Sequence, residues 1–387
     1  MSVPKLRFKE FDREWDLKSL GDCFNLFSGY AFPSNASVDN GIKWLKIADV
    51  GIQEMTPNNL SFLPNDFKVK FPQFIVLKND YVIALTRPIL NKNLKIAKVG
   101  EFYHGALLNQ RVAKIVSEYN NLDFIYSLLQ KSKTVEELEN SIAGTDPPNL
   151  SLNDVKEIVL GIPTVEEQTK IASFLLAIDK KISQLKQKHE LLSQYKQGMT
   201  QKLFSQQIRF KADDGSEFGE WEDAKLGSIC QNFQSGKSIT SAEISEDGIY
   251  PVYGGNGLRG YTNTFNHQGK FVLIGRQGAL CGNVVLIEGK NFVSEHAIAV
   301  QTKEKYSTDW LFRWLDYMQL NRFSESSAQA GLAVNKLVKF DIQTPCLEEQ
   351  TKIANFLSAI DQKIEVVTKQ IEQAKQWKKG LLQQMFV

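Results

Sequence analysis

The chain has 387 residues, of which 42% are hydrophobic and 23% are charged, and its formal net charge is +2. These values are typical of a soluble globular protein large enough for two or three domains. They exclude a strongly basic chain that would bind nucleic acid through its overall charge, so any basic surface must be local.

No unbroken apolar span is long enough to cross a membrane, so we predict no transmembrane segment. The four cysteines lie far apart without metal-ligand spacing, so we expect free thiols and a reducing compartment. Residues 1–10 are polar and basic and show no signal peptide. The prediction is therefore a cytoplasmic protein. The cysteines are Cys23, Cys230, Cys281 and Cys346.

Residues 1–162 are predicted to form a first globular unit. Runs rich in β-branched and aromatic residues, bounded by turn residues, predict strands. A helix is expected over residues 122–131. The pattern indicates mixed α/β or α+β structure. The predicted strands cover residues 41–50, 74–85, 94–99 and 111–116.

Residues 163–206 are predicted to form one long helix. It follows Pro163, and Glu166 and Glu167 then lie in the first turn, where the helix dipole favours negative charge. At about 1.5 Å per residue, roughly 40 residues make a rod about 60 Å long. This length favours a coiled coil over an ordinary globular helix.

Residues 207–344 are predicted to form a second globular unit, which opens with a polar linker at 211–219. Strands are expected at 271–274 and 284–287, and a helix at 308–321. The unit begins like the first, because Arg209 and Trp221 stand in phrases that resemble those of Arg7 and Trp15.

Residues 345–387 are predicted to form a second long helix, which repeats the first. Glu167 aligns with Glu349, an offset of 349 − 167 = 182, and fifteen of twenty positions are identical between 163–182 and 345–364. A repeat of this length indicates two similar halves, each ending in the same helix.

Both helices carry an apolar seam with a period of seven residues, which favours pairing with another helix. A globular unit between them can return the chain, so we predict an intramolecular antiparallel pair. The alternative is that each helix packs on its own unit as an amphipathic helix. The seam residues are Ile171, Leu175, Ile178, Ile182, Leu185 and Leu192, and Ile353, Leu357, Ile360, Ile364, Val367 and Ile371.

Three short motifs are typical of enzymes, and each lacks its context. Residues 255–260 fit G-x-G-x-x-G, but a strand or loop follows where a dinucleotide site needs a helix. Residues 236–238 lack the upstream glycine of a phosphate-binding loop. Residues 146–149 read D-P-P-N, without the aromatic residue that stacks on a flipped base. The histidines show no metal spacing either. We therefore predict that the chain is not an enzyme by itself.

Two variable units, each followed by P-x-x-E-E-Q-x-K-I-A-x-F-L-x-A-I-D-x-K-I, resemble the DNA-specificity subunit of a type I restriction–modification enzyme. The resemblance covers the whole chain. Phrases within the units agree with it, at 44–50, 86–88, 107–112, 251–261, 275–278 and 294–298. One departure is Thr344-Pro345-Cys346, which replaces a more proline-rich entry to the second helix.

The resemblance implies an α+β fold with a pseudo-two-fold internal repeat. Two target recognition domains of mixed α/β structure are separated by two long antiparallel helices that form an intramolecular coiled coil. Each domain would bind one half of a split, asymmetric site in double-stranded DNA, and the helices would fix the spacing. Two methyltransferase subunits and motor–nuclease subunits would be partners. This chain would bind no cofactor, while S-adenosylmethionine, ATP and Mg would belong to the partners.

Candidate DNA contacts follow from side-chain chemistry. Arginine donates two hydrogen bonds to guanine, Asn and Gln suit adenine, and lysines on loops or helices contact phosphates. The alternative is that some of these residues only maintain the fold. The candidates are Lys46, Arg87, Asn109, Gln110, Arg111, Lys180 and Lys181 in the first half, and Lys237, Asn256, Gly257, Arg259 and Arg276 in the second.

Two rival functions remain open at this stage. The chain could be a two-domain coiled-coil adaptor without a DNA role, which predicts no preference among DNA fragments. It could also be a self-contained methyltransferase or nuclease, which the incomplete motifs disfavour.

Overall fold

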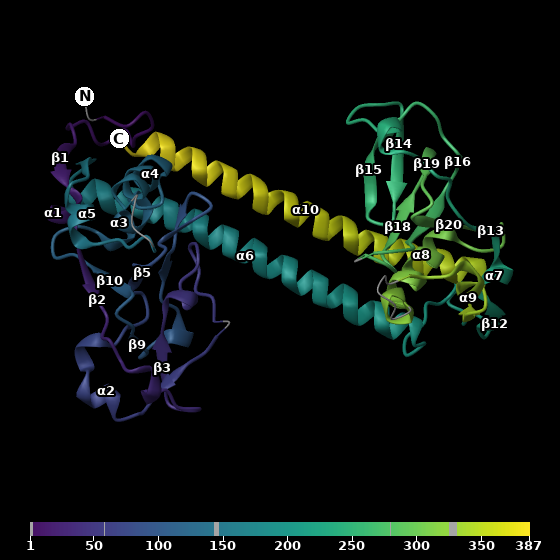
Figure 1. Cartoon of the computed structure of the whole chain (residues 1–387), viewed down its shortest axis with the longest axis horizontal. Coiled ribbons are helices and arrows are strands. Elements are labelled where there is room, and N and C mark those ends of the chain that lie inside the picture. Colours follow the sequence, from purple (N-terminus) through teal and green to yellow (C-terminus); the bar gives the residue numbers. More distant parts are fainter. Residues whose placement is uncertain (1–2, 58, 143–146, 279, 325–330) are drawn as a thin grey trace. The chain divides into compact units, whose positions relative to one another are not determined.

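A computed structural model describes every residue except 1–2, 58, 143–146, 279 and 325–330. The chain forms two compact units, residues 1–186 with 369–387, and residues 187–368. Each unit contains one globular part and portions of two long helices, α6 (Val165–Phe204) and α10 (Leu347–Met385) (Figure 1). The domain boundaries at residues 163, 207 and 345 stay a prediction, because each unit includes helix as well as globular part.

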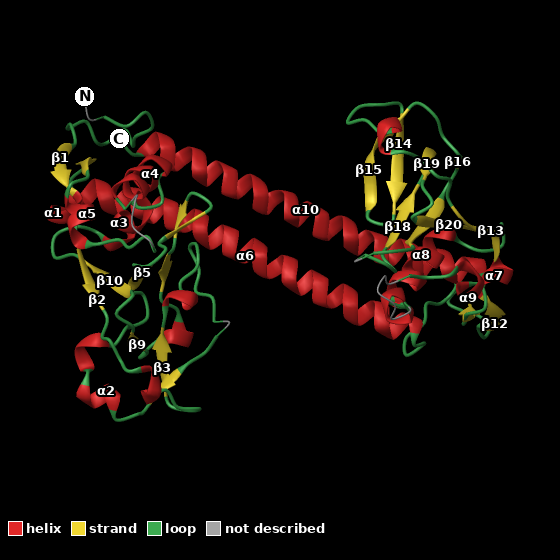
Figure 2. Cartoon of the chain, viewed as in Figure 1, coloured by secondary structure: helices red, strands yellow, loops and turns green. Residues whose placement is uncertain are grey.

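The globular part of the first unit combines short strands with five short α-helices in its described residues (Figure 2). Its elements in chain order are β1 (Asp16–Ser19), α1 (Leu20–Cys23), β2 (Asn25–Ser28), β3 (Ile42–Leu45), β4 (Phe62–Leu63), α2 (Phe67–Lys70), β5 (Tyr81–Ala84), β6 (Ile89–Leu90), β7 (Asn93–Leu94), β8 (Ile96–Lys98), β9 (Leu107–Leu108), β10 (Val112–Val116), α3 (Leu122–Leu128), α4 (Ser132–Ser141), α5 (Leu152–Lys156) and β11 (Val159–Ile162).

The second unit is built in the same manner. Its elements are β12 (Glu222–Lys225), α7 (Leu226–Ile229), β13 (Cys230–Ser235), β14 (Tyr250–Gly254), β15 (Gly257–Thr262), β16 (His267–Gln268), β17 (Phe271–Gly275), β18 (Val284–Ile287), β19 (Lys290–Val293), β20 (Ala297–Thr302), α8 (Thr308–Tyr317), α9 (Val334–Leu337) and β21 (Asp341–Thr344).

The globular parts of the two units share one topology. The main sheet has the order β2-β10-β5-β8 in the first unit and β13-β20-β17-β18 in the second. A parallel pair adjoins it in each case, β3 with β9 and β14 with β19. An antiparallel pair, β1 with β11 or β12 with β21, precedes each long helix. The internal repeat therefore includes the sheets, and the α+β fold predicted from the sequence is confirmed.

Two predicted strands are too long. Residues 74–85 were expected to be extended, but the strand β5 covers only Tyr81–Ala84, and a 3₁₀ turn covers Pro72–Phe74. Residues 41–50 were expected to be extended throughout, but β3 ends at Leu45 and a 3₁₀ turn covers Ile47–Asp49. The turn is stabilised because the Asp49 carboxylate accepts hydrogen bonds from the Lys46 backbone N–H and the Tyr103 hydroxyl, both at 2.8 Å. Asp146, the first residue of the D-P-P-N motif, lies outside the described residues.

The repeated E-E-Q motif connects each long helix to its own unit. In the first unit the buried Gln168 accepts a hydrogen bond from the Asn121 N–H at 2.9 Å, just before α3, and donates to the Pro163 carbonyl. In the second unit Gln350 makes the same two contacts, with the Ser307 N–H before α8 and the Pro345 carbonyl. A buried amide with both ends bonded holds two elements together.

Within each unit, part of α6 packs against part of α10. In the first unit the Phe174 and Trp377 rings lie 6.1 Å apart, and in the second the Tyr195 and Phe356 rings lie 6.5 Å apart. Contacts later in α6 thus fall earlier in α10, so the helices run antiparallel, as predicted.

Most of the predicted seam residues are buried, and the buried ones other than Leu185 and Val367 belong to the cores of their units. The buried ones are Ile171, Leu175, Ile178, Ile182, Leu185, Ile353, Leu357, Ile360 and Val367, and the half-buried ones are Leu192, Ile364 and Ile371.

One polar group interrupts the apolar seam of the first unit. Lys378 is buried, and its Nζ lies 2.6 Å from Asp179 on α6. The ammonium also donates to Gln130 at 2.8 Å and to Gln53 at 3.2 Å. Burial lowers the pKa of Lys378, and the negative charge of Asp179 partly offsets that effect. The amide oxygens allow a charge to remain in this core.

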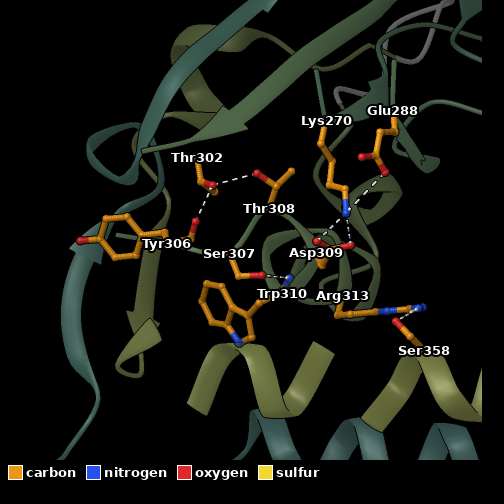
Figure 3. A network of polar contacts seen from close by, with 10 residues as sticks. All are labelled: Lys270, Glu288, Thr302, Tyr306, Ser307, Thr308, Asp309, Trp310, Arg313 and Ser358. Atoms are coloured by element: carbon orange, nitrogen blue, oxygen red, sulfur yellow. Dashed lines mark hydrogen bonds and ion pairs between the residues drawn. The ribbon is translucent and has the colours of Figure 1, made fainter. Parts of the chain in front are cut away.

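The second unit holds its helix α8 through a polar network (Figure 3). Lys270 pairs with Asp309 at the start of α8, with an N–O distance of 3.0 Å. Arg313 on the same helix donates to Ser358 at 3.1 Å and pairs with Asp361, both on α10. Together these contacts connect the sheet, α8 and α10 within one unit.

Candidate nucleic-acid interface

The turn between β9 and β10 carries three predicted DNA contacts of the first unit. The Asn109 backbone N–H donates to the Leu45 carbonyl at 3.0 Å, and its Oδ1 accepts from the Arg111 N–H at 3.0 Å. Asn109 is buried and forms the turn, whereas the side chains of Gln110 and Arg111 are exposed. The latter two are therefore free to reach a ligand.

Two further loops of the first unit meet at this turn. The Leu85 N–H donates to the Arg111 carbonyl at 2.9 Å, and Thr86 hydrogen-bonds to Asn149 at 2.6 Å. The loops surround an open hollow of about 440 Å³. It is lined by Leu85, Thr86, Gln110, Arg111, Pro147, Asn149 and Leu150.

Arg87 follows Thr86 in the loop after β5. It has a left-handed backbone, with a φ of 48°, and its N–H donates to the Pro148 carbonyl at 2.8 Å. Its side chain is exposed. Lys46 is engaged elsewhere, since its Nζ donates to Ser61 at 2.9 Å and lies 4.0 Å from the Trp44 ring centre.

In the second unit, glycines allow the backbones of neighbouring loops to pack directly against each other. A Cβ at Gly255 would meet the His296 carbonyl at 2.8 Å, and one at Gly275 would meet the Gly255 carbonyl at 2.6 Å. The Arg276 N–H donates to the His296 carbonyl at 2.9 Å. Because no side chain separates these loops, three of them converge at the turn that joins β19 to β20.

The remaining candidates of the second unit border these loops. Asn256 is exposed in the hairpin turn between β14 and β15, and Gly257 has a φ of 89°. Lys237 and Arg259 are exposed, and the Lys237 N–H donates to the Val293 carbonyl at 3.0 Å. Sequence reasoning expected no helix after Gly255, and the strand β15 confirms this.

Lys180 and Lys181 lie on α6, outside the loops. Both side chains are exposed, next to the buried seam residues Ile178 and Ile182. Contact of these lysines, and of the loop residues, with DNA stays a prediction.

Glu295 and His296 were not predicted as DNA contacts, although they lie beside the loops that carry the predicted ones. They occupy the turn between β19 and β20, which corresponds to the Gln110–Arg111 turn between β9 and β10. The sequence signal is weak, because L-N-Q-R-V and V-S-E-H-A share no residue at matching positions. Only the common strand order relates them.

Among the described residues, no group of three or more His, Cys, Asp or Glu side chains is placed to hold a metal ion. All four cysteines are free thiols. In the described part of the chain, none of the helices has the length and apolarity needed to span a membrane.

Comparisons with known proteins agree on one family. The family described as "Type I restriction modification DNA specificity domain" matches residues 12–194 and 219–376. The EcoprrI specificity subunit of Escherichia coli is 40% identical over 160 residues, which are 40% of this chain and 39% of that protein. The MjaVIII specificity subunit of Methanocaldococcus jannaschii is 30% identical over 212 residues, 54% of this chain and 50% of that protein. The alignments thus span half or less of these relatives.

The fold comparison extends over the full chain. The crystal structure of an S subunit from M. genitalium superposes with a TM-score of 0.68 at 19% identity, covering 100% of this chain and 99% of that one. At this identity the likeness concerns the fold.

Proposed function

Because the chain belongs to the type I restriction–modification DNA specificity family, we propose that it selects the DNA site for a complex whose other subunits perform the chemistry. Each unit reads one half of a bipartite, asymmetric site in double-stranded DNA. The chain itself is not catalytic and binds no cofactor. S-adenosylmethionine, ATP and Mg bind to the partner subunits. The complex works in the cytoplasm.

The observation that carries this proposal is the repeated topology with unlike loops. Both units present the turn after their second parallel strand beside the end of β5 or β17. The first unit offers Gln110 and Arg111 there, and the second offers Glu295 and His296. Equivalent frames with different hydrogen-bonding groups support recognition of two different half-sites.

The long helices support a fixed spacing between the half-sites. Each has an uninterrupted run of about 40 residues and a buried seam within each unit. A spacer matters because one added base pair rotates a half-site by about a tenth of a helical turn. We propose that the helix pair sets the number of unread base pairs.

A repeated aromatic cluster supports docking of two methyltransferase subunits. In the first unit Phe174 packs edge-on against Phe8 at 5.9 Å and contacts Trp377, which is 55% exposed. In the second unit Phe356 packs against Phe210 at 5.5 Å and contacts Tyr195, which is 51% exposed. Half-exposed aromatic anchors are typical of binding hot spots, and two equal copies suit two copies of one partner.

Replacing one anchor should remove one partner. Trp377→Ala is expected to weaken methyltransferase binding at one of the two sites by about 30-fold, the effect of losing a hot-spot residue. The Trp377→Ala, Tyr195→Ala double variant should weaken both. Native mass spectrometry of the assembled complex would show two, one or no bound subunits. Gln373→Ala, an exposed neighbour on α10, serves as the control and should retain two. Retention of both subunits by the double variant would contradict this docking surface.

The function itself is tested by mapping methylated adenines in a host with and without this gene. A bipartite, asymmetric motif with a constant spacer should appear only when the gene is present. The absence of any gene-dependent motif, with the methyltransferase subunit present and active, would refute the proposal.

A further inference from the structure

We infer that Glu295 reads a base of the second half-site by accepting a hydrogen bond from the exocyclic amine of cytosine or adenine. This inference rests on the function proposed above. It concerns a residue whose chemistry is opposite to that of the basic candidates around it.

The first support is position. Glu295 lies in the turn between β19 and β20, whose backbone contacts the loops of Gly255 and Arg276. The corresponding turn of the first unit holds Gln110 next to the open hollow. Both turns are fixed in the same way, because the Leu85 N–H donates to the Arg111 carbonyl and the Arg276 N–H to the His296 carbonyl, each at 2.9 Å.

The second support is the absence of a structural role among the described residues. The Glu295 Oε2 atom has no hydrogen-bond partner there and is covered by protein. The side chain as a whole is 34% exposed, and it would meet a base through its exposed edge. Its Oε1 has one neighbouring donor, His296 Nε2, at the long distance of 3.5 Å. A carboxylate that stabilised the fold would receive short, charge-assisted bonds, as Glu349 does from Arg209 at 2.7 Å. An acceptor left without a donor requires another explanation.

The third support is electrostatic. A carboxylate on a DNA-reading surface is repelled by the phosphates, so it cannot serve as a backbone contact. Its favourable partners in the major groove are the amino groups, N4 of cytosine and N6 of adenine. The exposed side chains of Lys237 and Arg259 border the same loops and compensate the repulsion. Glu295 therefore adds specificity and not general affinity.

The experiment uses the complete methyltransferase complex and a pool of DNA duplexes randomised across the second half-site. Glu295→Gln keeps the size of the side chain but adds an N–H₂ donor, which tolerates the acceptors of guanine and thymine. We expect discrimination at one position of the second half-site to fall about tenfold, with the first half-site unchanged. Glu304→Gln, an exposed carboxylate in the loop after β20, should change nothing.

A second measurement starts from the unaltered complex, so its first result does not depend on the folding of a variant. In duplexes bound by the unaltered complex, single exocyclic amines of the second half-site are removed by base analogues. At least one deletion should weaken binding about tenfold, and the Glu295→Gln complex should be insensitive to that deletion.

The outcomes are distinct. If no amine deletion weakens binding, or if Glu295→Gln keeps the original preference at every position, this inference is wrong while site selection by the chain stands. If the unaltered complex shows no bipartite motif, the proposed function itself fails.

Discussion

The double substitution Ile178→Asp with Ile360→Asp is expected to abolish the packing of the helix pair in both units. The two side chains are 6% and 4% exposed and belong to separate cores. Truncating a buried Ile costs about 2–5 kcal/mol, and a buried unpaired carboxylate adds several more. Since a typical domain is stable by about 5–15 kcal/mol, each unit should lose most of its stability.

Circular dichroism at 222 nm and a thermal scan of the free chain would measure this loss. The matched control is Leu191→Asp with Val366→Asp, on the same helices but 57% and 54% exposed. These changes should shift the transition by only a few degrees, because exposed substitutions usually change stability by less than about 0.5 kcal/mol.

The same double variant tests the proposed spacing role. Loss of the seam should abolish methylation or allow sites whose spacer differs by one base pair. Methylation of the same split site with unchanged spacing, by a chain that has lost its helix pair, would refute the idea that the helices set the distance.

Glu349→Ala is expected to give the largest effect of any single charge removal in the second unit. The carboxylate has no exposed surface and accepts hydrogen bonds from Arg209 Nε at 3.1 Å, Arg209 Nη2 at 2.7 Å and Trp221 Nε1 at 3.1 Å. The hydrogen bonds to Glu349 also raise the pKa of Arg209. Breaking a buried pair costs about 3–5 kcal/mol, because the remaining charge stays partly desolvated. Arg209 is 23% exposed, so we expect the lower part of that range.

Urea unfolding followed by tryptophan fluorescence would measure the change. Glu348→Ala is the control, since this adjacent carboxylate is 55% exposed and should matter by less than about 0.5 kcal/mol. Glu167→Ala removes the equivalent pair with Arg7 and should destabilise the first unit instead. Equal stability of Glu349→Ala and Glu348→Ala would contradict the proposed importance of the pair.

Several features of this protein were determined by the sequence itself. The offset of 182 residues, the two long helices and most buried seam positions could be predicted, because helix burial follows a short period and the repeat is nearly identical. Pro163 and Pro345 also indicated where the two long helices begin. The acidic pairs could be assigned to the first turn of each helix, but the ion pairs of Glu167 with Arg7 and of Glu349 with Arg209 could not be predicted.

Only the tertiary structure decided which distant residues the repeat motif and the loops contact. Arg7 meets Glu167 across 160 residues, and Gln168 meets Asn121 across 47. The turn of Glu295 corresponds to that of Gln110 only through the strand order of two sheets. Such contacts join distant segments without any sequence period, and backbone packing at Gly255 and Gly275 leaves no side-chain pattern to read. Local periodicity therefore predicts the helices, whereas the loops come together only after the strands have paired.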